Sequence, residues 1–333
     1  MISRTTDIRT LFLQGRVNLD RGRDMDTGSV VEVRMHDDQR EIDEQVVREL
    51  VDEQFPEWRS LSIRPVPGFG TVNAIFRIGE DYTARFPLTG EAGPTADTLR
   101  REATALAELA DACPFAAPQP VAAGRPGAGY PLPWSVQTWI PGAVATPDSV
   151  SRSAAFAGDL ARLVRALREA PTRGRAFGGR GRGGDLRDSD DWMATCLKES
   201  VDLLPVDRLH ALWERMRTLP APGRVAMTHG DLIPGNLLVR GDRLVGVLDG
   251  GGFGPTDPAL DLVAGWHLLD TDARAVFRAG IGSDDLEWRR GAAWAFQQAM
   301  GLVWYYRHSN PAMSALGRST LHRLLGDDHI GRA

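Results

Sequence analysis

Three polar residues stand close together in the second half of the chain: Asp231, Asn236 and Asp249. Glycine and proline interrupt any helix or strand around the first two, so both lie on a loop. A hairpin with a turn at Gly241-Asp242 follows, and it brings Asp249 back to this loop. One carboxylate can take the proton of a hydroxyl group, while an amide and a second carboxylate can hold Mg²⁺ on phosphate groups. The pattern therefore indicates phosphoryl transfer, with Asp231 as the catalytic residue and Asn236 and Asp249 as metal ligands.

The run His229-Gly230-Asp231, with Asn236 five residues after the aspartate and a strand that ends in Asp249, resembles the aminoglycoside phosphotransferase family. The resemblance covers roughly residues 40–326. It implies an α+β, protein-kinase-like fold with two lobes, a small antiparallel-sheet N-terminal lobe and a mainly helical C-terminal lobe. It also implies transfer of the γ-phosphoryl group of ATP or GTP, with Mg²⁺, to a hydroxyl of a small molecule. In such a site His229 holds the loop by hydrogen bonds.

Polarity divides the chain into three parts. Residues 1–36 are polar and rich in Arg and Asp, and they are predicted to form a poorly ordered N-terminal extension. Apolar residues at helical spacing begin at Ile42. We expect a nucleotide-binding N-terminal lobe over residues 37–140 and a catalytic, substrate-binding C-terminal lobe over residues 141–333.

The predicted N-terminal lobe offers groups for nucleotide phosphates. Strand-like runs over residues 61–66, 74–78 and 82–86 enclose a glycine-rich turn whose backbone N–H groups can approach phosphate oxygens. The candidates there are Gly68, Gly70, Thr71 and Asn73. Kinase-like folds place a cation on the third strand, paired with a helix glutamate. No lysine precedes residue 198, so Arg85 is expected in that place, with Glu102 of a helix over residues 96–111 as its partner. A surface Arg and a surface Glu are the alternative.

Two further segments complete the N-terminal lobe in this resemblance. Residues 118–129 resemble the two central strands of the family's sheet with their turn. Residues 134–142 resemble the last strand and the hinge between the lobes. The resemblance implies that backbone groups of Gln137, Thr138 and Trp139 meet the edge of the nucleotide base.

The remainder is predicted to be helical apart from the hairpin. Apolar spacing predicts helices over residues 154–168, 192–203, 208–219, 274–280, 284–306 and 312–325. Asp257-Pro258 is typical of a helix start, and Asp261 resembles the aspartate that holds the catalytic loop's backbone. Both are expected to support the site. The Gly/Arg-rich run 172–184 is interpreted as a solvated linker, with a flap over substrate or nucleotide as the alternative.

Composition argues against several other classes of protein. The 42% hydrophobic and 25% charged fractions are those of a globular protein, and the net charge of −5 argues against nucleic-acid binding. No apolar run is long enough for a membrane helix, and two cysteines favour a reducing cytoplasm. Lys198, the only lysine, is not in a Walker A loop, and the histidines lack zinc-site spacing.

Several alternatives stay open at this stage. The polar residues of the loop could merely cap turns. Arg85, Gly250 and Ile233 stand where the family often has other residues, which favours a non-catalytic, nucleotide-binding pseudokinase as the second hypothesis. A metal-dependent hydrolase could use the same acids without a nucleotide. From Gly250 onward the sequence contains nine Asp and Glu residues and eight Arg residues. It therefore does not indicate an acidic surface for a polycationic aminoglycoside. A macrolide, another antibiotic or a metabolite alcohol therefore remains possible as acceptor, and the sequence does not indicate an oligomeric state.

Overall fold

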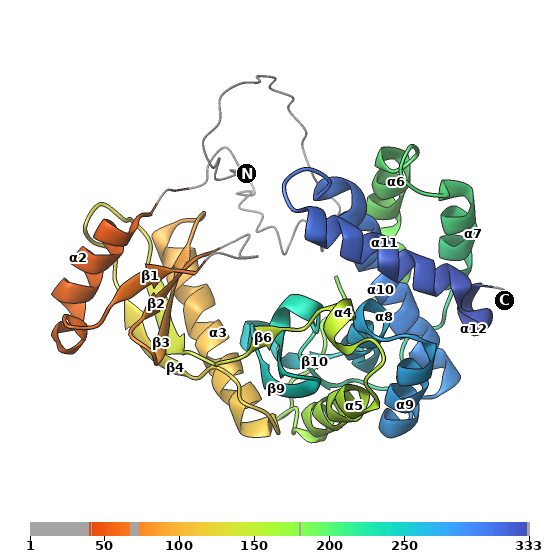
Figure 1. The fold of residues 1–333 in the computed structure, drawn as a ribbon, viewed down its shortest axis with the longest axis horizontal. Coiled ribbons are helices and arrows are strands. Elements are labelled where there is room, and N and C mark those ends of the chain that lie inside the picture. Colours follow the sequence, from red (N-terminus) through yellow and green to blue (C-terminus); the bar gives the residue numbers. More distant parts are fainter. Residues whose placement is uncertain (1–39, 41, 67–72, 180, 332–333) are drawn as a thin grey trace.

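The computed structural model of the protein describes residues 40, 42–66, 73–179 and 181–331. The expected extension over residues 1–36 and the candidates Gly68, Gly70 and Thr71 lie outside this part of the chain. Within it, an antiparallel sheet forms the N-terminal part and helices form most of the C-terminal part, as predicted (Figure 1). No helix in the described residues is apolar over a length that could cross a membrane.

The N-terminal part is a five-stranded antiparallel sheet in the order β1-β2-β3-β5-β4. Its elements are α2 (Glu44–Gln54), a 3-10 turn (Pro56–Trp58), β1 (Ile63–Pro65), β2 (Asn73–Ile78), β3 (Tyr82–Pro87), α3 (Ala92–Ala112), β4 (Pro120–Gly124) and β5 (Trp134–Thr138). Buried residues of α2 pack with Phe86 and Trp134 of the sheet, whose rings stack at 4.7 Å. This apolar cluster holds β3, and with it Arg85, in a fixed position.

One strand prediction was wrong. Residues 118–129 hold a single strand, β4, rather than two strands and a turn. The next strand is β5, and it lies between β3 and β4. After Gly124 the prolines lack the N–H donor that a strand needs, and Ala128 and Gly129 have positive φ, so the chain turns instead of forming a second strand. Gly124 itself is required because a Cβ there would lie 1.9 Å from the Trp134 ring.

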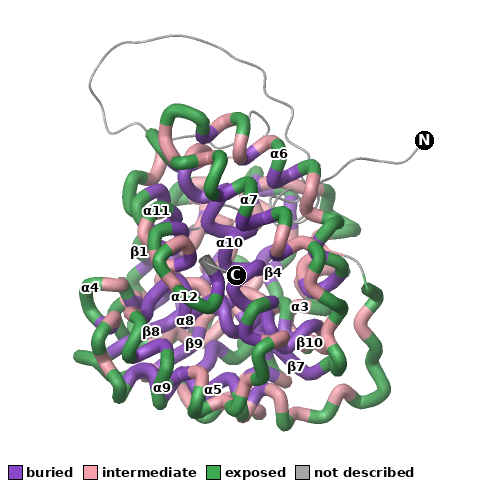
Figure 2. The backbone as a smooth tube through the Cα atoms, turned by 90° about the vertical axis from the view of Figure 1, so that its right-hand side faces the viewer, coloured by how far each residue is buried: buried purple, intermediate pink, exposed green. Residues whose placement is uncertain are grey.

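The C-terminal part is built around α10, which is buried along most of its length (Figure 2). The helices are α4 (Pro147–Val150), α5 (Ala154–Glu169), α6 (Asp190–Glu199), α7 (Val206–Met216), α8 (Val263–Leu268), α9 (Thr271–Ile281), α10 (Asp285–Tyr305), α11 (Pro311–Gly326) and α12 (Asp328–Gly331). The predicted helices are present, with ends shifted by a few residues. Short 3-10 helices cover residues 186–189, 234–236, 250–252 and 258–262.

Two small sheets position the loop that carries Asp231. In one, β7 (Ala226–Thr228) pairs antiparallel with β10 (Gly254–Thr256). In the other, β8 (Leu237–Arg240) lies between β6 (Ala143–Val144) and β9 (Arg243–Val247), and β8 and β9 form the predicted hairpin. The loop therefore begins at the end of β7 and ends at the start of β8, so strands fix both of its ends.

The two parts are joined by more than the chain between β5 and β6. Ala116, just after α3, bridges to Gly246 of β9, and a Cβ on Gly246 would lie 2.7 Å from Ile140. Leu109 of α3 belongs to the apolar cluster of the C-terminal helices. Helix α3 thus lies between the sheet and the C-terminal part (Figure 1). We propose the same division of the chain at residue 140 that the sequence indicated.

Candidate active site

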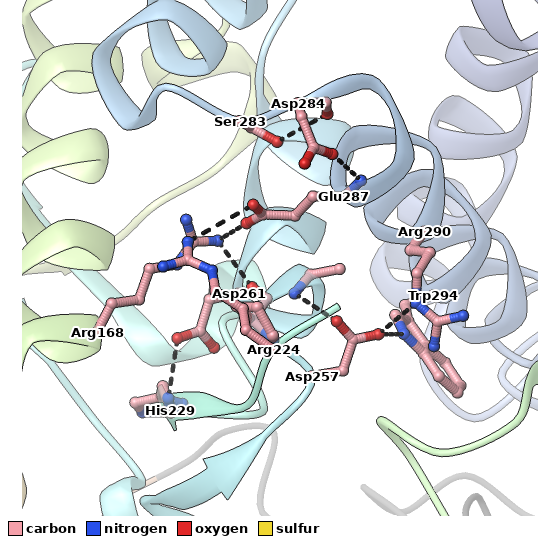
Figure 3. Close-up of polar contacts among 12 residues, drawn as sticks. Arg168, Arg224, His229, Asp257, Asp261, Ser283, Asp284, Glu287, Arg290 and Trp294 are labelled. Atoms are coloured by element: carbon pink, nitrogen blue, oxygen red, sulfur yellow. Dashed lines mark hydrogen bonds and ion pairs between the residues drawn. The ribbon is translucent and has the colours of Figure 1, made fainter. Parts of the chain in front are cut away.

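Asp261 fixes the backbone at the start of the loop. Its two carboxylate oxygens accept from the backbone N–H groups of His229 and Gly230, both at 2.9 Å. Asp261 is fully buried, and burial raises its pKa, while the two N–H donors and the positive charge of Arg168 act in the opposite direction. Figure 3 shows the contact between His229 and Asp261, with Arg168 on the other side of the carboxylate. These are the bonds that a loop-holding aspartate must make.

His229 connects the loop to the hairpin. Its Nδ1 accepts from the backbone N–H of Asp231 at 3.3 Å, and its Nε2 lies 2.8 Å from the carbonyl oxygen of Leu248. A ring nitrogen that accepts must be unprotonated, so the proton is on Nε2, which donates to that carbonyl. Both ring nitrogens are thus engaged in hydrogen bonds to the backbone of the loop and of the hairpin. This fits the expectation that His229 holds the loop.

Asp231 and Asn236 lie against each other across the loop. The side-chain Nδ2 of Asn236 donates to the backbone oxygen of Asp231 at 2.9 Å and to its Oδ2 at 3.2 Å. The amide oxygen Oδ1 of Asn236 is then the atom that can meet a cation. The backbone N–H of Leu248 donates to the carbonyl oxygen of Asn236 at 2.8 Å, which sets Asp249 next to this amide. The three residues singled out in the sequence are thus brought together.

Asp249 has a left-handed backbone, with φ of 60° and ψ of 45°. This region is unfavourable for most residues with a side chain, although Asp and Asn tolerate it best. Its carboxylate forms an ion pair with Arg85 of β3, with 3.3 Å between Oδ1 and Nη2. The pair is largely shielded from solvent, since the exposed fractions are 13% for Arg85 and 25% for Asp249. Arg85 therefore points into the site, and not to the surface.

Helix α3 packs directly on the turn after Asp249. A Cβ on Gly251 would lie 2.9 Å from Cγ of Glu102, and a Cβ on Gly250 would lie 2.1 Å from Leu109. Glu102 is thus located beside the turn that presents Asp249. Gly250, one of the residues at which the chain departs from the family, is buried, and Leu109 fills the space that a side chain would need.

Residues 137–139 were expected to meet the edge of the nucleotide base, but some of their backbone groups already form other hydrogen bonds. The backbone N–H of Thr138 donates to Gln119, and that of Trp139 donates to Asp81. Gln137 is paired with β3 and β4. A base edge at this segment would therefore be met by carbonyl oxygens or by residues after Trp139. Asn73 is the first residue of β2 and pairs with Pro87.

Asp257 supports the site through a buried network that the sequence did not indicate. It caps the following 3-10 helix by accepting from Ala259, as predicted. Its Oδ2 also accepts from Arg290 Nε at 2.8 Å and from Trp294 at 2.9 Å, as Figure 3 shows. Arg290 is 1% exposed and its Nη2 donates to the carbonyl oxygen of Gly184. The network therefore anchors the end of the Gly/Arg-rich run.

Arg182 is the residue of the site that sequence reasoning missed. Its Nη1 lies 2.8 Å from Oδ1 of Asp231, and its side chain is 17% exposed. The interpretation of residues 172–184 as a solvated linker was therefore wrong for residues 181–184, because Arg182 lies against the catalytic loop, whereas most of residues 172–179 are exposed as expected. The only signal in the sequence was an unusual density of arginine and glycine, and composition alone does not tell which arginine turns inward.

The donors present fit a magnesium ion. Among the described residues, no group of three or more His, Cys, Asp or Glu could form a metal cage. Mg²⁺ does not require one, since it usually takes one or two protein oxygens together with phosphates and water. Oδ1 of Asn236 and the carboxylate of Asp249 are oxygen donors on adjacent backbone segments. They are the groups that would hold the ion and neutralise phosphate charge.

Comparison with known proteins gives one family and one fold. A family model described as the phosphotransferase enzyme family (APH) matches residues 62–294. The GDP and kanamycin complex of APH(2")-IIia has a TM-score of 0.63 at 21% identity, over 83% of this chain and 97% of that chain. Macrolide 2'-phosphotransferase MphH from Brachybacterium faecium gives 0.55 at 17% identity, over 83% and 97%. Comparison with curated proteins gives no match. The structural likeness confirms the kinase-like fold.

Proposed function

This chain belongs to the phosphotransferase enzyme family (APH), and from that membership we propose that it is a small-molecule kinase. The reaction moves the γ-phosphoryl group of ATP or GTP to a hydroxyl group of the acceptor. The observation that carries the proposal is the convergence of Asp231, Asn236 and Asp249, with Arg85 paired across the two parts of the molecule to Asp249. Each of these groups has a separate task in phosphoryl transfer.

In the proposed mechanism Asp231 accepts the proton of the acceptor hydroxyl and orients its oxygen toward phosphorus. Asn236 and Asp249 would hold Mg²⁺, which neutralises charge on the phosphates when bound. Arg85 gives a planar cation for phosphate oxygens, and Arg can bind two of them at once. Glu102 keeps the turn after Asp249 in place from α3. Most of the rate enhancement then comes from positioning and charge neutralisation.

The acceptor is proposed to be antibiotic-like or a metabolite alcohol. Similar structures include a kanamycin complex and a macrolide 2'-phosphotransferase, so aminoglycoside and macrolide types are both candidates. The near balance of nine acidic residues and eight arginines from Gly250 onward favours an acceptor with little positive charge. Two free cysteines, one of them buried, fit a reducing compartment, and we place the enzyme in the cytoplasm.

A screen of acceptors tests this function. Purified protein with Mg²⁺ and either ATP or GTP is assayed for nucleoside diphosphate release against macrolides, aminoglycosides and hydroxylated metabolites. We expect acceptor-dependent release, reduced at least about 10³-fold in Asp231→Ala. Asp249→Asn keeps a residue that tolerates the left-handed backbone and should lose Mg²⁺-dependent turnover.

Three outcomes separate the alternatives. Transfer that survives in Asp231→Ala would contradict the role of this carboxylate as base. Nucleotide binding without turnover on any acceptor would favour a pseudokinase. Hydrolysis of a substrate in the absence of nucleotide would favour the metal-dependent hydrolase.

A further inference from the structure

The guanidinium of Arg182 has donors that the protein does not use. Nη1 is bound to Asp231, but Nε and Nη2 are buried and have no hydrogen-bond partner within the described part of the chain. Buried charged donors without acceptors are costly and uncommon in folded proteins. Nε and Nη2 form one edge of the guanidinium plane, and this edge matches two oxygens of a phosphate group.

The backbone at Arg182 is held in place, so the side chain does not reach the site by chance. Gly183 has φ of 93°, and a Cβ there would lie 2.0 Å from Oγ1 of Thr256. The carbonyl oxygen of Gly184 accepts from Arg290 at 3.0 Å, and Arg290 is bound to the buried Asp257. Only glycine fits at Gly183, and the carbonyl two residues after Arg182 is anchored in the core.

We infer that Arg182 is a further catalytic residue, which binds the phosphoryl group in transfer through Nε and Nη2 while Nη1 holds Asp231. This inference depends on the proposed function. The site of transfer must lie beside Asp231, because that carboxylate takes the proton of the attacking hydroxyl. A cation 2.8 Å from Asp231 is therefore next to the phosphorus atom as it moves. Arginine at this position meets the negative charge on the equatorial oxygens.

The step itself balances without a new reactant. The acceptor oxygen forms a bond to the γ-phosphorus, and the bond from that phosphorus to the oxygen it shares with the β-phosphate breaks. The electron pair of the broken bond leaves with the nucleoside diphosphate. The hydroxyl proton passes to Asp231 and then to water. Arg182 forms and breaks no covalent bond, and it stabilises the charge of the phosphoryl group during transfer.

The test compares Arg182→Ala and Arg182→Lys with a control arginine of the same run. Arg175 pairs with Glu108 of α3, and its Nη2 lies 3.6 Å from Sδ of Met227 in β7, so Arg175→Ala removes an equivalent charge that is not bound to Asp231. The probes are Mg²⁺ with ADP or GDP, alone and with aluminium fluoride, which mimics a phosphoryl group in transfer. Binding is measured by calorimetry, and folding is checked by thermal melting.

We expect Arg182→Ala to bind the diphosphate within about twofold of wild type and to lose about 10²-fold or more of the additional affinity with aluminium fluoride. Lysine keeps a charge for Asp231 but has no two-nitrogen edge, so Arg182→Lys should recover only part of this loss. Arg175→Ala should behave as wild type. Millimolar guanidinium should restore part of the affinity in Arg182→Ala.

Two results would overturn the inference. Unchanged affinity for the aluminium fluoride complex in Arg182→Ala would remove Arg182 from the transition state. Faster nucleotide turnover in Arg182→Ala would show that the arginine restrains Asp231 instead. In both cases the wild type still binds the nucleotide, so the proposed function stands. A wild type that binds neither ADP nor GDP would overturn the proposed function and this inference together.

Discussion

At the scale of single residues, the two carboxylates that we propose for catalysis and metal binding, Asp231 and Asp249, are each paired with an arginine. Arg182 contacts Asp231 and Arg85 contacts Asp249. A guanidinium stays protonated at any physiological pH and keeps a fixed planar geometry. Each carboxylate therefore faces a planar cation that can bind two oxygens at once, which the ammonium group of a lysine cannot do in the same way. The only lysine, Lys198, lies on α6.

The buried His267 makes the free energy of unfolding of the chain depend on pH. It is fully buried, with Nδ1 2.9 Å from Thr320 and Nε2 3.0 Å from Gln298. Burial lowers the pKa of His267 from 6.5 to about 4, against the smaller effect of its bond to Gln298. Between these two values the unfolded chain takes up a proton that the folded chain does not. The contribution of the neutral His267 to the free energy of unfolding is thus fully present above pH 6.5 and is lost as the pH falls toward 4.

We expect His267→Gln to remove this dependence. Wild type should lose up to about 3 kcal/mol more than the variant in the free energy of unfolding between pH 7 and pH 4. Urea denaturation at a series of pH values measures both. Equal pH profiles for the two proteins would mean that His267 does not titrate in this way.

The sequence itself was sufficient for residues that share a local pattern, whereas Arg85 and Asp261, whose partners are distant in the chain, were expected only from the family resemblance. Asp231, Asn236 and Asp249 were recognised because their spacing on a loop and hairpin brings them together. Arg182 and Arg290 were not, since their partners lie 49 and 33 residues away. A glycine-rich run has no hydrophobic period from which an inward-facing residue could be predicted. Contacts with distant residues, such as that of Gly183 with Thr256, decide which side chain points inward.

At the scale of elements, α3 connects the sheet to the turn that presents Asp249. Its residues Leu106 and Leu109 approach Gly250, and Glu102 approaches Gly251. A shift of α3 therefore must move this turn. Helix limits were predictable because apolar spacing is a local property. The single strand between residues 118 and 129 was not, because strand pairing depends on a partner elsewhere in the chain.

Gly250→Ala tests this packing. The added Cβ would lie 2.1 Å from Leu109, so we expect a loss of about 1–3 kcal/mol in the free energy of unfolding. Gly252→Ala is the matched control, because its nearest neighbour is a carbonyl oxygen of His229 at 3.8 Å, and it should cost much less. Chemical denaturation measures each variant.

A double-mutant cycle with Leu109→Ala should show a favourable coupling, because the smaller side chain makes room for the new methyl group. Additive losses in the cycle would mean that Leu109 is not the residue that excludes a side chain at Gly250.

At the scale of the whole molecule, the site draws on both parts of the chain. Arg85 comes from the sheet and Asp249 from the C-terminal part, and each part has its own apolar cluster. A nucleotide that contacts both groups adds a link between these clusters. Binding should therefore stabilise the molecule as a unit, and the metal should be needed for this effect.

Calorimetric melting with Mg²⁺ and ADP or GDP measures that stabilisation. At a ligand concentration of about 100 times Kd we expect about 2.7 kcal/mol, which raises Tm by several degrees. Asp249→Asn should lose the Mg²⁺-dependent part, whereas Asp231→Ala should keep it because its carboxylate serves the acceptor. A full Mg²⁺-dependent shift in Asp249→Asn would place the metal elsewhere.

The two halves of the run that carries Arg182 differ in the space that they leave for a new side chain. A Cβ on Gly178 would meet nothing within 4 Å, whereas one on Gly183 or Gly184 would collide with neighbouring atoms. A side chain can therefore be added at Gly178 without displacing a neighbour, whereas at Gly183 or Gly184 it would shift the backbone that places Arg182. We expect related sequences to vary at Gly178 and to keep glycine at Gly183 and Gly184, because only that backbone leaves Arg182 in contact with Asp231.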